Sequence, residues 1–128
     1  MLFRSEADLV VGTVKIYNSA TTVGNISDFT YFNIDEIYSN GSALQLVMAN
    51  MSNGKMGISV TGSAGNGLSL ASCNRNTINA QIFNNGGAGI VNGAGCLANV
   101  FIGHSFANVG TNFSDGGTNT NFVALTVL

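Results

Sequence analysis

The sequence contains no proline and no tryptophan, and only 8% of its 128 residues are charged. Because a globular chain ordinarily carries about 25% charged residues, the polar surface of this protein must come mainly from neutral side chains. Two cysteines are too few for a disulfide-rich scaffold, and with a single histidine they do not complete a metal coordination shell. We therefore expect no bound metal and no cofactor.

Long apolar runs and basic clusters are also missing. The longest apolar stretches, such as residues 44–49 and 123–128, fall far short of the roughly 18 to 20 residues that a membrane span needs. The four Lys and Arg residues are scattered and the net charge is −2, which argues against nucleic acid as a partner. Residues 1–8 lack the basic and apolar regions of a secretion signal, so export would need another route or a segment outside this chain.

Asparagine and glycine are unusually abundant in this sequence. The chain has 18 Asn and 17 Gly, which tolerate the positive φ angles of tight turns. Between the turns, apolar residues alternate with polar ones over short stretches, for example residues 44–46, 58–60, 68–70 and 100–102. A period of two predicts strands, and no segment has a helical stripe, so we expect an all-β fold.

A repeat of about 23 residues organises these strands. Several residue types recur at this interval and form columns: Val14, Ile37, Val60, Phe83 and Phe106; Asn53, Asn76 and Asn99; Cys73 and Cys96; Asn85 and Asn108. From Cys73 onward the register is expected to continue without gaps, pairing Ile90 with Phe113 and Val100 with Val123. Upstream it requires a one-residue slip, because Leu44, Leu68 and Ile90 are 24 and 22 residues apart.

Two all-β arrangements fit alternating strands with Asn–Gly turns. An antiparallel sandwich or barrel would use these turns in hairpins, but it gives no reason for identical side chains to recur at a fixed interval. In a parallel coil each residue lies about 4.8 Å from its equivalent in the next coil, so like side chains stack. We predict a single-stranded parallel β-helix of about five coils, with residues 1–24 as an N-terminal segment and first coil and residues 25–128 as the remaining coils.

The coil length, the Asn-rich turns and the segments 66–70, 76–78 and 87–91 resemble the pectate-lyase-like superfamily of right-handed β-helices. Within it, the low charge is most similar to the β-helical regions of bacteriophage tailspikes and tail fibres. The resemblance covers roughly residues 25–121. It implies a right-handed helix in a virion-borne homotrimer, whose long faces contact a bacterial surface polysaccharide and in some members cleave it.

Cleavage of a glycan requires two carboxyl groups about 5 to 9.5 Å apart. Asp28, Asp35 and Asp115 are the weak catalytic candidates. Asp35 and Glu36 are neighbours and would point to opposite faces of one strand, and Asp115 is expected to stack on Asn92 rather than on another acid. The sequence thus favours a protein without catalytic activity.

Tyr31, Asp35 and Tyr38 form the best candidate binding group, because aromatic rings stack on sugars while a carboxylate accepts bonds from their hydroxyls. Lys55 and Arg75 are expected to be solvated turn residues.

Cys73 and Cys96 are predicted to lie in adjacent coils, with their Cα atoms about 4.8 Å apart. That separation permits a disulfide, while two buried reduced thiols would also pack as small apolar groups, and we favour the reduced pair. His104, one coil from Gln81, is expected to be a surface or stacking residue.

Three functions remain for such a chain. The first is a non-catalytic, trimeric β-helical segment of a phage tail or virion surface protein that contacts host glycan. The second is a fragment of a polysaccharide depolymerase, acting as a hydrolase or a lyase. The third is an extracellular adhesin, a filament-forming solenoid or an ice-binding solenoid. The expected location is the virion, in a phage tail, or the extracellular space.

Overall fold

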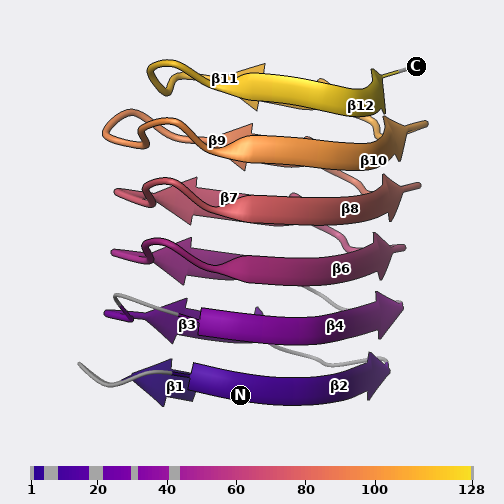
Figure 1. The fold of residues 1–128 in the computed structure, drawn as a ribbon. Helices are drawn as coiled ribbons and strands as arrows, with labels where there is room; N and C mark the ends of the chain where they lie inside the picture. Colours follow the sequence, from indigo (N-terminus) through magenta and orange to yellow (C-terminus); the bar gives the residue numbers. More distant parts are fainter. Residues whose placement is uncertain (1, 5–8, 18–21, 30–31, 41–43, 128) are drawn as a thin grey trace.

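The computed structural model describes residues 2–4, 9–17, 22–29, 32–40 and 44–127. The chain winds as a right-handed parallel β-solenoid, which confirms the predicted fold class (Figure 1). Strands on the near side of the solenoid run in one direction, and the chain returns through strands on the far side before it rises to the next coil (Figure 1). The described residues contain no helix.

Two six-stranded parallel sheets form the opposite walls of the solenoid. Sheet A contains β1 (Leu2–Arg4), β3 (Thr22–Ser27), β5 (Leu44–Ala49), β7 (Leu68–Ala71), β9 (Ile90–Asn92) and β11 (Phe113–Asp115). Sheet B contains β2 (Leu9–Tyr17), β4 (Phe32–Asn40), β6 (Lys55–Thr61), β8 (Thr77–Phe83), β10 (Val100–Phe106) and β12 (Asn121–Val127). A third column of single parallel bridges links turn residues Ser52, Asn74, Leu97 and Thr118. The division between residues 24 and 25 stays a prediction.

The core lies between the two sheets and follows from the alternation in the sequence. In β6 and β8 every second residue is buried, and the residues between them face solvent. Ile58, Ile82 and Phe101 point inward and are at most 2% exposed. Burying a side chain of this size stabilises the fold by about 1.5 to 3 kcal/mol, so the stacked inward rows supply most of the driving force.

The register confirms part of the predicted columns. Val14 pairs with Ile37, Phe83 with Phe106, and Ile90 with Phe113. The Phe83 and Phe106 rings stack with centroids 5.2 Å apart.

The middle of the predicted apolar column is wrong. Ile37 pairs with Ile58 rather than with Val60, and Val60 pairs with Ile82 rather than with Phe83. The pairing of β4 with β6 shifts between Ile34 and Ile37, where β4 carries one more residue than β6. This bulge and a coil of 22 residues move the later strands out of a strict interval of 23.

Two further predicted pairings are wrong for the same kind of reason. Leu68 pairs with Leu46 instead of Leu44, because the coil that leads from β5 to β7 is 22 residues long. Val100 pairs with Asn121 instead of Val123, and the ladder to β12 shifts again between Phe101 and Gly103. Gly103 has φ 113, and a Cβ there would overlap the Ala80 carbonyl oxygen of β8, so only glycine fits this point of β10.

Asparagine ladders tie the coils together at the turns. The Oδ1 atom of Asn99 accepts the backbone N–H of Asn76 at 3.1 Å, and Oδ1 of Asn76 accepts the N–H of Gly54 at 3.1 Å. Asn53 was predicted for this column, but it lies one position away because that coil has 22 residues. Its Oδ1 instead accepts a hydrogen bond from Arg75 Nε at 3.1 Å. Asn85 and Asn108 form a second ladder of the same kind, as predicted.

Three columns of left-handed residues mark the corners of the coils. All have φ between 52 and 90, and they comprise Asp28, Asn50, Ser72 and Gly95; Asn53, Arg75, Ala98 and Asn119; and Gly62, Asn84 and Ala107. A left-handed conformation costs an L-residue roughly 1 to 2 kcal/mol unless it is Gly, Asn or Asp. The corner geometry is thus retained even where alanine, serine or arginine must adopt it.

Cys73 and Cys96 stack in adjacent coils, and no disulfide joins them in the structure. The backbone N–H of Cys73 donates to Sγ of Cys96 at 3.4 Å, and both side chains are buried. Burial raises the pKa of the Cys73 thiol from 9.0 to about 11, so the thiol is protonated at neutral pH. The predicted stack of the two cysteines is present, and their reduced state stays a prediction.

Candidate functional site

Polar side chains and one glycine line the outer face of sheet B across β4, β6 and β8. On these strands Lys55 pairs with Asn33 on one side and with Thr77 on the other, and Gly57 pairs with Asn79. These are outward-facing positions, because the residues between them, such as Met56 and Ile78, are buried. The face therefore presents two short rows of polar groups with a gap at Gly57.

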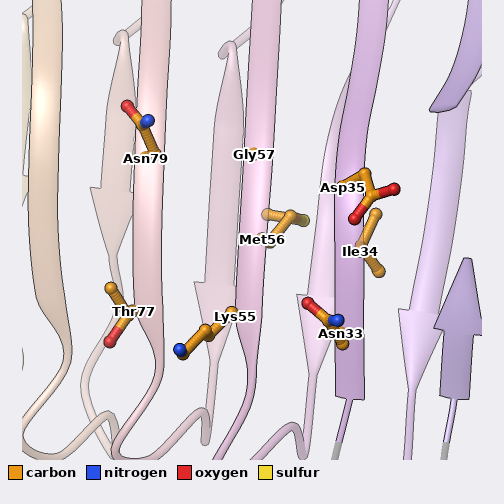
Figure 2. Close-up of a pocket in the computed structure, with 8 residues that line it drawn as sticks. All are labelled: Asn33, Ile34, Asp35, Lys55, Met56, Gly57, Thr77 and Asn79. Atoms are coloured by element: carbon orange, nitrogen blue, oxygen red, sulfur yellow. The ribbon is translucent and has the colours of Figure 1, made fainter. Parts of the chain in front are cut away.

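The gap opens into a shallow hollow of about 270 Å³ (Figure 2). It is lined by Asn33, Ile34, Asp35, Lys55, Met56, Gly57, Thr77 and Asn79. Gly57 forms the floor because it has no side chain, whereas its neighbours on the adjacent strands, Asp35 and Asn79, rise on either side. A second hollow of about 210 Å³ adjoins the first and is lined by Asp35, Gly57, Ile58, Asn79 and Gln81.

The bulge in β4 positions Asp35. The paired register breaks after Ile34 and resumes at Ile37, so Asp35 lies in the irregular stretch opposite Gly57. Bulges re-aim side chains and are frequent next to functional sites. Here the bulge directs a carboxylate to the rim that the two hollows share.

The charged groups of the hollow are exposed. Asp35 and Lys55 are both solvent-exposed, and neither makes an ion pair within the described part of the chain. Figure 2 shows them at opposite corners of the first hollow, with the Lys55 side chain extending from β6 toward Thr77. A carboxylate, an ammonium group, amides and a hydroxyl around an open floor provide both donors and acceptors for a polyhydroxylated ligand.

The other catalytic candidates do not share this site. Asp28 follows β3 of sheet A and accepts a hydrogen bond from Asn50 Nδ2 at 2.9 Å. Asp115 ends β11, and its Oδ1 accepts bonds from Asn92 Nδ2 at 2.9 Å, as the predicted stacking requires, and from Gly117 N at 3.0 Å. Four strand steps separate β3 from β11, or about 19 Å, so these two acids cannot act together on one glycosidic bond.

The predicted aromatic binding group is covered only in part. Tyr31 lies outside the described residues, and Tyr38 lies in β4, where it pairs with Ser59. Of this group, the structure describes only the side chain of Asp35, and it lines the hollow.

Lys55, Gly57 and Asn79 were missed as members of a binding site. Lys55 begins β6 and lines the hollow, so its prediction as a turn residue is wrong. The signal available in the sequence was a glycine at an outward position of an alternating strand, between Lys55 and Ser59. Such a position leaves a gap in a row of side chains.

The remaining polar candidates lie elsewhere. Arg75 is an exposed corner residue held by Asn53, and His104 is exposed on β10 opposite Gln81, both as predicted. Among the described residues, no group of three His, Cys, Asp or Glu side chains could hold a metal ion. Nor does that part of the chain include a helix long and apolar enough to cross a membrane.

Comparison with known proteins gives no relative for this chain. No model of a known protein family matches it, and no curated protein or solved structure is similar enough to count as a match. The function must therefore be argued from the solenoid and its face.

Proposed function

We propose that this chain is a non-catalytic β-solenoid segment that binds a glycan on the outer face of sheet B. The observation that carries the proposal is the hollow at Gly57, where Asp35, Lys55 and Asn79 face solvent around an open floor. Sugar hydroxyls both donate and accept hydrogen bonds, and the carboxylate and amides of this hollow supply the matching partners. The stacked coils hold these groups on strands rather than on loops, so the site is preorganised.

The resemblance to phage tailspikes supports a more specific form of the proposal. In it, the chain belongs to a homotrimeric tail or virion surface protein and contacts a bacterial surface polysaccharide. Asp35 is the one carboxylate among the described side chains that line the hollow, which fits binding better than cleavage because a glycosidase needs two. Sedimentation equilibrium tests the assembly: a mass of three chains supports the trimer, and a monomer at micromolar concentration contradicts it.

A glycan array that includes bacterial capsular and lipopolysaccharide glycans tests binding. We expect signals that Gly57→Val removes, because valine would fill the floor between Asp35 and Asn79. Gly57 is not among the glycines with positive φ, and valine suits a strand, so the variant should fold. Ser69→Val is the matched control, since it places the same side chain on β7 of sheet A. No binding to any glycan, or equal binding by Gly57→Val, would refute the proposal.

A further inference from the structure

The two hollows form one groove along the strands of sheet B. They share Asp35, Gly57 and Asn79, and they extend in opposite directions from that shared rim. The first reaches Thr77 and the second reaches Gln81 on β8, four residues further along the strand. At about 3.3 Å per residue the groove is about 13 Å long, which suits a disaccharide unit rather than a single sugar.

Charge is distributed unequally between the hollows. Lys55 lines only the first hollow, whereas Asp35 lines both. In the first hollow the ammonium and carboxylate groups lie at opposite corners (Figure 2). Among the side chains that the structure describes, Asp35 is the charged one that lines the second hollow, and the other polar ones are the amides of Asn79 and Gln81. A carboxylated sugar would thus be attracted to the first hollow and repelled from the second.

We infer that the groove binds a linear glycan in which a carboxylated sugar alternates with a neutral one. This inference rests on the proposed glycan-binding function and names the class of glycan. The carboxylated sugar lies in the first hollow, where its carboxylate contacts Lys55 Nζ. The neutral sugar lies in the second hollow, where its hydroxyls bind Asp35 and the two amides.

Three hexasaccharides with different charge patterns test this order. Hyaluronan hexasaccharide alternates glucuronate with neutral N-acetylglucosamine, hexagalacturonate carries an acid on every sugar, and N-acetylchitohexaose carries none. Titration calorimetry at low salt should give the highest affinity for the hyaluronan oligosaccharide.

Two variants assign the preference to its residues. Lys55→Gln should lower hyaluronan affinity by about two- to fivefold, the range for a solvent-exposed ion pair. Arg75→Gln removes the same charge from a corner outside the groove and should leave the affinity unchanged. Asp35→Asn should reduce the discrimination against hexagalacturonate, because it removes the repulsion in the second hollow.

The possible outcomes separate this inference from the proposed function. The inference would be overturned if hexagalacturonate or N-acetylchitohexaose bound as tightly as the hyaluronan oligosaccharide or more tightly. It would also be overturned if Lys55→Gln lowered hyaluronan affinity no more than Arg75→Gln. Absence of binding by all three would also overturn it. The glycan array with Gly57→Val decides the proposed function independently, because that array does not assume a charge pattern.

Discussion

Replacing Asn99 by alanine tests how much the asparagine ladder contributes to stability. Asn99 is 0% exposed, and its side chain makes four hydrogen bonds, to Asn76 N–H and Nδ2, to the Cys73 carbonyl and to Asn92 Oδ1. In Asn99→Ala the backbone N–H of Asn76 and the Oδ1 atom of Asn92 lose their hydrogen-bond partner. The side-chain Nδ2 of Asn76 still donates to the Met51 carbonyl, and the Cys73 carbonyl still accepts from the Leu97 N–H. An orphaned buried group costs about 1 to 3 kcal/mol, so we expect a loss of about 2 to 6 kcal/mol.

Urea unfolding followed by circular dichroism measures this loss as a change in the free energy of unfolding. Asn79→Ala is the matched control, because Asn79 is exposed on β8 and its replacement should change stability by no more than about 0.5 kcal/mol. A loss below about 1 kcal/mol for Asn99→Ala, or one equal to that of Asn79→Ala, would refute the view that the ladder stabilises the stacked coils.

Five other substitutions probe backbone strain and burial. Ala107→Gly should raise stability by up to about 1 kcal/mol in thermal unfolding, because Ala107 has φ 53, whereas Ala71→Gly in β7 should lower it by about 0.5 to 1 kcal/mol. A gain in stability in both Ala107→Gly and Ala71→Gly, or in neither, would contradict the strain argument. Gly103→Ala should lower stability by more than about 3 kcal/mol, because the added Cβ would overlap the backbone of Ala80. In Gly95→Ala the added Cβ would make only ordinary van der Waals contact with Ser72, so the change should cost about 1 to 2 kcal/mol. Equal unfolding midpoints for the two variants would be the contrary result. The Cys73 thiol, with its pKa raised from 9.0 to about 11, contributes stability that is complete below pH 9 and is lost as the pH rises toward 11, by about 2 to 3 kcal/mol. Cys73→Ala should therefore show a smaller fall in stability over this pH range, and an unchanged fall would contradict the assignment.

The solenoid could be predicted from the sequence because rare side chains stack on their own kind. Cys73 over Cys96 and Phe83 over Phe106 repeat at one interval, and no antiparallel fold explains that recurrence. The predicted gap-free register fails between β10 and β12, where the ladder shifts between Phe101 and Gly103. Nor could the exact register be predicted upstream of β8. There the bulge at Asp35 and the 22-residue coils change the interval, and a coil that is one residue shorter leaves the alternation within each strand unchanged.

The candidate site was less accessible to prediction than the fold. Asp35 was singled out as an acid beside tyrosines, but the hollow depends on Gly57, whose contribution is the absence of a side chain. Asp35 and Asn79 come next to Gly57 only through pairing of β6 with β4 and β8, which requires the correct register. The corners were equally hidden, because alanine at positions 98 and 107 gives no sign of positive φ.

The hydrogen bonds at the turns also bear on how the protein ages chemically. An Asn–Gly step in a mobile chain loses ammonia when the glycine nitrogen attacks the asparagine side-chain carbonyl carbon and closes a succinimide ring. Four of the five such steps in the sequence lie in the described residues, and in each the glycine N–H donates to a neighbouring coil: Gly54 to Asn76 Oδ1, Gly67 to Ala88 O, Gly86 to Ser63 O and Gly93 to Leu70 O. With those nitrogens held in place, deamidation must await local opening of a coil. A chain this rich in a labile dipeptide thus gains chemical durability from its own winding.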